Sequence, residues 1–169
     1  AENQGMHSYW RWDAMLEHNQ RGYFPYTPST NLLYGLEEAL NLLHREGLDN
    51  VYARHSRFAA ATRAALAGWE LENVCLNPAE FCNSTTAVMM PEGYDADDLR
   101  EDILSRFDMS LGTGLGRLKG LVFRIGHLGD FNELMLMGTL SGVEMGLKLG
   151  DVPHRTGGVQ QAMDALIGS

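Results

Sequence analysis

The chain has 169 residues, of which 44% are hydrophobic and 21% are charged, as in ordinary globular domains. A chain of this length can bury a real core, so the composition excludes wholesale disorder and a fibrous repeat. Thirteen basic residues against 22 acidic ones leave a net charge of −9. This balance argues against nucleic acid or an anionic membrane as the main partner, because phosphate groups are bound by clustered Lys and Arg.

Motif searches exclude further classes of protein. Cys75 and Cys82 are the only cysteines; they allow one disulfide but form no scaffold, so we expect a reduced, cytoplasmic setting. No CxxC or HExxH motif occurs and the six histidines are scattered, so we predict no metal site. No apolar run reaches ~18 residues and no signal-peptide pattern is present, so we expect no membrane segment.

The first 47 residues are predicted to contain two helices joined by a rigid strap. An aromatic-rich helix is expected over 8–20. The segment GYFPYTPST at 22–30 carries two prolines, and each restricts the residue before it to extended backbone. Leucines at three- and four-residue spacing then predict an amphipathic helix over 31–47, with Gly47 as its C-cap.

The rest of the chain mixes helical and β patterns. The later β-rich segments have short connections, which favours one antiparallel sheet of three or four strands with helices on one face. We therefore predict an α/β sandwich of the α+β type, with central strands near 85–90, 109–114 and 121–126. The individual segments are predicted helices at 49–68, 95–107, 130–149 and 159–167, and predicted strands at 71–76, 85–90, 109–111 and 121–125.

Three signals refine the helices. Asp95 is a candidate N-cap, and Asp130 with Glu133 three residues later gives a capping-box pattern. The last long helix also contains three glycines, which cost it ~2–3 kcal/mol relative to alanines. We therefore expect another element to approach this stripe closely. The glycines are spaced by four residues, at Gly138, Gly142 and Gly146.

Arg124 is the most informative single residue. It lies inside the strand LVFRIG between Phe123 and Ile125, where a lone guanidinium is costly to bury. Either it pairs with a structural carboxylate, or it points into a site that binds an anion, for which its forked donors are suited. The residues alone support these two interpretations about equally. The preceding GTGLG segment lacks the helix that a phosphate loop needs, because Lys119 is followed by Gly120 and a strand, so we interpret it as a turn.

Three stretches of the chain resemble a known family. Residues 23–55, 86–100 and 111–149 are similar to the C-terminal part of class V pyridoxal-phosphate aminotransferases. The nearest subgroup is the serine–glyoxylate and alanine–glyoxylate (serine–pyruvate) aminotransferases. The motif RIGHLGD after a GLG-containing loop and the pattern TP-x-x-x-LLYGL carry the resemblance, which extends over roughly residues 8–167.

The resemblance implies the C-terminal domain of the fold-type I architecture. In this family a large domain holds the cofactor and the Schiff-base lysine, and a small C-terminal domain closes over it. The chain would then divide into an arm and strap (1–30), a linking helix (31–47) and the small domain (48–169), without the large domain. Lys119 and Lys148 do not match the Schiff-base lysine. We therefore expect no catalytic residue in this chain, no cofactor bound by it alone and no activity by itself.

The resemblance also implies roles for single residues. The arginine of the RIG strand binds the substrate α-carboxylate in this family, which assigns that role to Arg124. The strap contributes to the cofactor phosphate across a dimer interface, and Thr27 matches its threonine. Related enzymes carry a tyrosine three residues before that threonine. This chain has Phe24 there, which leaves Tyr26 as the substitute phenol.

The implied function is that of an enzyme fragment. The parent would use pyridoxal 5'-phosphate to move an amino group from serine or alanine to glyoxylate or a related 2-oxo acid, and it would be a homo-oligomer. The rival hypothesis is a stand-alone, non-catalytic module that kept the small-domain fold for binding or assembly. A lesser alternative is another class V transferase or lyase with a different amino donor. A lysine-bearing domain encoded directly upstream would favour the first hypothesis, and a native start near Met6 would favour the second.

Overall fold

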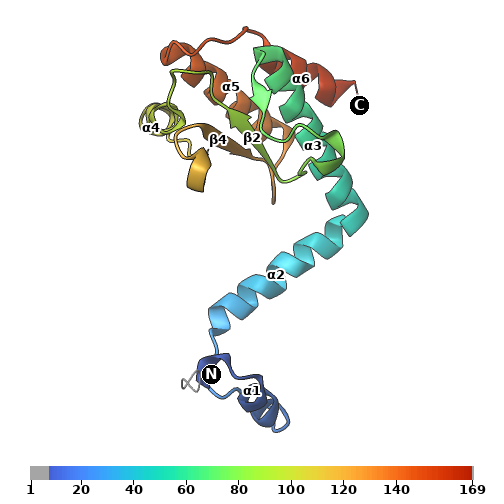
Figure 1. The fold of residues 1–169 in the computed structure, drawn as a ribbon. Helices are drawn as coiled ribbons and strands as arrows, with labels where there is room; N and C mark the ends of the chain where they lie inside the picture. Colours follow the sequence, from blue (N-terminus) through green and yellow to red (C-terminus); the bar gives the residue numbers. More distant parts are fainter. Residues whose placement is uncertain (1–7, 169) are drawn as a thin grey trace. The chain divides into compact units, whose positions relative to one another are not determined.

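The structure is a computed structural model that describes residues 8–168 (Figure 1). The chain divides into two compact units, Ala1–Gly47 and Leu48–Ser169, and each is described by itself. Residues 1–7 of the predicted arm lie outside the described residues.

The first unit contains the predicted arm, strap and amphipathic helix. The aromatic segment forms a 3-10 turn, η1 (Ser8–Trp10), and a short helix, α1 (Trp12–Asn19). The strap leads to α2 (Thr30–Glu46), which ends at Gly47 with a φ of 85° that favours glycine. Neither α1 nor α2 buries a residue, although α2 has a clear apolar stripe.

The second unit is built on a four-stranded sheet in the order β1-β2-β4-β3, with every neighbouring pair antiparallel. This confirms the predicted sheet. The strand expected at 109–111 instead begins at Gly112, because the Leu111 carbonyl accepts a hydrogen bond from Arg100 Nε at 2.8 Å and does not join the ladder. The strands are β1 (Glu72–Asn73), β2 (Thr85–Met89), β3 (Gly112–Thr113) and β4 (Val122–Gly126).

Helices cover one face of this sheet. Val88 of β2 and Phe123 and Ile125 of β4 are fully buried in a core that they share with apolar residues of the helices. Figure 1 shows α3, α5 and α6 grouped together beside and above β2 and β4 in the view. The helices of this unit are α3 (Leu48–Trp69), α4 (Ala96–Phe107), α5 (Glu133–Leu149) and α6 (Gly158–Ile167), with short 3-10 turns η2 (Pro78–Glu80) and η3 (Gly116–Leu118).

One predicted cap is confirmed and one is wrong. Asp95 caps α4, since its side chain accepts from the backbone N–H of Asp97 at 2.7 Å. The capping box at Asp130 does not form, and Asn132 caps α5 instead. The reason lies in α3, where Arg54 Nη1 donates to the carbonyls of Gly129 and Phe131 at 2.8 and 3.1 Å and holds the preceding loop out of the helix.

Glycines allow two close helix contacts. On α5, a Cβ at Gly142 would lie 2.7 Å from Met109 Cε, and one at Gly146 would overlap Ile103 of α4. The expected close approach is therefore confirmed at these two positions, whereas Gly138 faces open space. On α3, a Cβ at Gly68 would lie 2.7 Å from the Cα of Gly158, so α3 and α6 meet almost backbone to backbone.

Candidate functional site

Arg124 lies on the sheet face that the helices leave uncovered. Side chains alternate along β4, so Phe123 and Ile125 enter the core while Arg124 between them points the other way and is half-buried. Because of this alternation the charge of Arg124 does not enter the core, and the free-energy cost of burying a guanidinium in an apolar strand does not arise.

Small residues flank Arg124 on both sides. In the register of the sheet it pairs with Ala87 of β2 and Gly112 of β3. A Cβ on Gly112 would lie 3.1 Å from both Cβ and Nε of Arg124, so glycine is what lets the side chain lie flat across β3. The small residues of the neighbouring strands therefore make room for the Arg124 side chain.

The guanidinium makes one hydrogen bond within the described residues. Arg124 Nε donates to the Thr113 carbonyl at 2.9 Å, and no carboxylate among residues 8–168 pairs with it. Neither terminal nitrogen has a partner among the described residues. Of the two interpretations that the sequence leaves open, the structural ion pair does not form among these residues, and the anion-binding role stays a prediction.

A short polar network supports the strand that receives this bond. Thr113 Oγ1 lies 2.9 Å from Asp97 Oδ1 on α4, and Arg100 Nη1 donates to the same oxygen at 2.8 Å. The hydrogen bond from Thr113 lowers the pKa of the Asp97 carboxyl, helped by the nearby charge of Arg100 and opposed by partial burial. Asp97 is therefore held as an acceptor between α4 and β3.

The predicted phosphate-binding residues lie in the strap of the first unit. Residues 22–28 line an open hollow of about 710 Å³. Thr27 is exposed, and its hydroxyl has no partner among the described residues. Tyr26 is 40% exposed, and its ring packs against Tyr9 with centroids 5.5 Å apart. Free hydroxyl donors fit one or two contacts to a phosphate, and the strap itself offers it no cation.

Comparison with known proteins shows which proteins the chain is similar to. No family model matches it. It is 47% identical over 139 residues to serine–glyoxylate aminotransferase of Methylorubrum extorquens, covering 82% of this chain and 35% of that protein. It is 48% identical over 138 residues to the enzyme of the same name from Arabidopsis thaliana, covering 81% and 34%.

The fold is also similar to that of a solved aminotransferase structure. The chain superimposes on ureidoglycine–glyoxylate aminotransferase of Bacillus subtilis with a TM-score of 0.82 and 26% identity, over 89% of this chain and 40% of that one. The chain is therefore similar to the C-terminal part of aminotransferases of class V. It spans about a third of the length of the curated aminotransferases that it matches, which fits the C-terminal part of such an enzyme.

Both lysines of the chain are exposed. Lys119 lies in the turn before β4 and lines an open hollow there with Tyr94 and Asp95, and Lys148 lies at the end of α5. Residues 8–168 also contain no cluster of His, Cys, Asp or Glu that could hold a metal ion, and none of their helices is long and apolar enough to cross a membrane.

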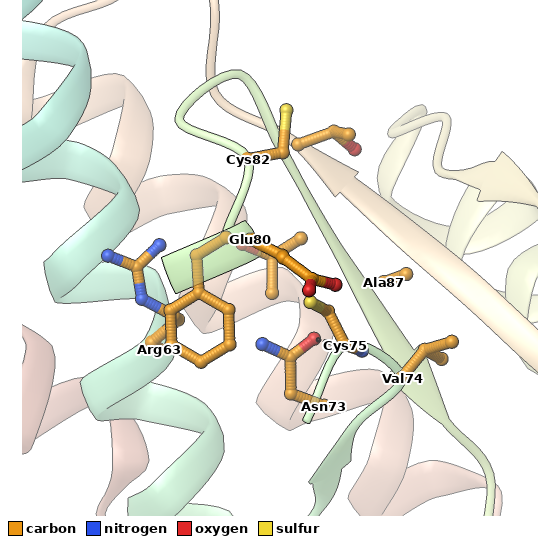
Figure 2. Close-up of a pocket in the computed structure, with 10 residues that line it drawn as sticks. Arg63, Asn73, Val74, Cys75, Glu80, Cys82 and Ala87 are labelled. Carbon is orange, nitrogen blue, oxygen red and sulfur yellow. Dashed lines mark hydrogen bonds between the residues drawn. The ribbon is translucent and has the colours of Figure 1, made fainter. Parts of the chain in front are cut away.

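Sequence reasoning missed a hollow in the second unit. Figure 2 shows it between α3, the loop around η2 and the edge of β2, with a volume of about 210 Å³. Arg63 stacks over the Phe81 ring, with Cζ 4.7 Å from the ring centroid, and burial lowers the pKa of its guanidinium. Both free cysteines also line the hollow, and a hydrogen bond from Ser84 lowers the pKa of the Cys82 thiol. These residues come from three segments without a shared motif, so no sequence signal was available.

Sequence reasoning also missed a buried histidine. His127 directly follows β4 and is fully buried, with Nε2 2.9 Å from Thr86 Oγ1. Burial, helped by the nearby charge of Arg63, lowers the pKa of His127 to about 4. The ring is therefore neutral and belongs to the packing beneath the sheet. Its place directly after the apolar strand VFRIG was the available signal.

Proposed function

We propose that this chain is the substrate-carboxylate-binding part of an aminotransferase that moves an amino group from serine or alanine to glyoxylate or a related 2-oxo acid. The observation that carries the proposal is Arg124, whose two terminal nitrogens have no partner among residues 8–168 and lie on an open sheet face. The names of the relatives support glyoxylate as the acceptor and serine as one donor.

One guanidinium serves both halves of such a reaction. The amino acid donor and the 2-oxo acid acceptor both carry an α-carboxylate, which Arg124 would bind with two parallel hydrogen bonds. A carboxylate fixed at two points orients the bond at Cα that must break, and such positioning contributes a large share of catalysis. Pyridoxal 5'-phosphate, when bound, supplies the electron sink for this chemistry.

The strap would contribute to holding the cofactor. The exposed Thr27 hydroxyl can donate to a phosphate oxygen, and the Tyr26 hydroxyl can supply a second contact. No cation of the strap would neutralise the phosphate, so the remaining contacts would come from outside this segment. We propose that the first unit works in a homo-oligomer, in which a partner covers the apolar stripe of α2 and its neighbouring aromatic rings.

A graft tests the proposal. The stretch of this chain that matches the Methylorubrum extorquens enzyme over 139 residues replaces the corresponding segment of that enzyme, and turnover of serine and glyoxylate is measured. Arg124→Lys should raise KM about 5- to 150-fold with the cofactor still bound, because one ammonium cannot reproduce two parallel bonds and the loss is about 1–3 kcal/mol. Arg106→Lys is the matched control, since Arg106 is exposed on α4.

Two results would contradict the proposal. Unchanged KM values for both substrates in the Arg124→Lys graft would show that Arg124 does not bind the carboxylate. A folded graft that binds the cofactor but turns over neither substrate would favour the non-catalytic module.

A further inference from the structure

The Arg124 side chain is held at its inner nitrogen, and this limits how it can bind a ligand. Nε donates to the Thr113 carbonyl at 2.9 Å, so a carboxylate cannot use the side of the guanidinium that pairs Nε with a terminal nitrogen. The opposite, outer edge of the guanidinium, formed by the two terminal nitrogens, has no partner in the described residues. A bidentate ligand must therefore approach end-on, along the axis of the side chain.

The acceptor of that bond is itself fixed from α4. β3 is only two residues long, so its ladder to β4 can contribute little rigidity by itself. The Thr113 hydroxyl lies 2.9 Å from Asp97 Oδ1, and its second neighbour, the Gly114 carbonyl, is farther away at 3.2 Å. A hydroxyl has one proton, and the bond to the carboxylate is the stronger because the acceptor is charged.

Arg100 completes the attachment of β3 to α4. Its Nη1 donates to Asp97 Oδ1 and its Nε to the Leu111 carbonyl, each at 2.8 Å. The side chain therefore fixes both Asp97 and the residue that precedes β3. A continuous path of hydrogen bonds runs from the first turn of α4 through Thr113 to Arg124 Nε.

We infer that Asp97 is a positioning residue for Arg124, acting through Thr113, and that the guanidinium so held takes a substrate carboxylate end-on on its two terminal nitrogens. The carboxylate-binding role rests on the proposed function, whereas the hydrogen-bond path does not. Asp97 touches no substrate in this scheme. It sets the angle at which the outer edge of the guanidinium faces the open side of the sheet.

The path is tested on this chain by NMR of the arginine Nε–Hε groups, with the Arg124 signal assigned by its loss in Arg124→Lys. In the unsubstituted chain, Hε of Arg124 should exchange with water about tenfold more slowly than Hε of the exposed Arg106. Asp97→Ala and Thr113→Val should remove this protection. Asp98→Ala, which alters an exposed carboxylate of the same helical turn, and Thr113→Ser, which keeps the hydroxyl, should preserve it.

Two outcomes would overturn the inference. The first is an Arg124 Hε in the unsubstituted chain that exchanges as fast as that of Arg106, a result that does not depend on any variant folding. The second is full protection in Asp97→Ala, with a native spectrum shown by the Ile125 methyl signals.

The graft separates this inference from the proposed function. Asp97→Ala should raise KM about tenfold there with kcat nearly unchanged, and Asp98→Ala should change neither. If protection is lost in Asp97→Ala while both Asp97→Ala and Arg124→Lys leave KM unchanged, the path stands and the carboxylate role fails. If Arg124→Lys raises KM while Asp97→Ala changes neither exchange nor KM, the role stands and the positioning inference fails.

Discussion

The burial of His127 makes the stability of the second unit depend on pH in a defined window. Its folded-state pKa is about 4, against 6.5 for a free histidine, and the side chain is fully buried beside Thr86. Because the folded pKa is the lower one, the unfolded chain binds the proton first. The stability is therefore fully present above pH ~6.5 and is lost as the pH falls from there to ~4.

The magnitude follows from the two pKa values. A difference of about 2.5 units corresponds to a total loss of about 3 kcal/mol at 1.36 kcal/mol per unit, and about 2 kcal/mol of it falls between pH 7.5 and pH 5.0. This upper window avoids most carboxylates, which titrate lower. Since a domain is stable by only about 5–15 kcal/mol, the loss is readily measured.

Urea unfolding followed by circular dichroism provides the assay, with His127→Gln as the reference. Glutamine does not titrate, and its amide can still bond to the Thr86 hydroxyl. The free energy of unfolding should fall about 2 kcal/mol more for the unsubstituted chain than for the variant between the two pH values. Equal slopes for the two proteins, or an NMR titration of the His127 ring near pH 6.5, would refute the reasoning.

Four further predictions address the site and the assembly. Gly112→Ala should weaken substrate binding in the graft, because the new Cβ would lie 3.1 Å from Arg124 Nε and displace the guanidinium; an unchanged KM would contradict this. Glu144→Ala should lower the free energy of unfolding by about 2–3 kcal/mol in urea, since it deprives the Trp69 ring N–H and the backbone N–H groups of Gly157 and Val159, at the start of α6, of their acceptor. The chain alone, mixed with pyridoxal phosphate and gel-filtered, should keep no cofactor that borohydride fixes to a lysine, because both lysines are exposed and a stable link needs a desolvated one; a fixed adduct with turnover would refute this. The chain should also self-associate through residues 8–46, and a clean monomer in concentrated sedimentation runs would argue against it.

The sequence predicted those features that depend on local pattern. The strand around Arg124 follows from its β-forming residues, and its half-exposure follows from the alternation with Phe123 and Ile125, which both enter the core. Asp95 is a correct cap because the cap bond joins residues two apart. In each of these cases the deciding interaction lies within one element.

Features that depend on contacts between distant segments could not be predicted. Asp97 and Thr113 are 16 positions apart and meet only because α4 packs beside β3. The helix predicted to start at Asp130 starts at Glu133 in the structure. Arg54 of α3 binds the loop that precedes it, about 75 positions away in the chain. No local pattern records either contact.

Because α3 packs against α6, the core of this unit can be completed only after α6 has been synthesised. α3 is synthesised before α6, and Gly68 meets its partner Gly158 in the last described helix, 90 positions later in the chain. The face of α3 around Trp69 therefore stays uncovered until almost the whole unit has been synthesised. Contacts between residues this distant in sequence slow folding, because the intervening chain loses conformational entropy before the contacts stabilise it. Nascent chains that end before α6 would expose this apolar face to chaperones.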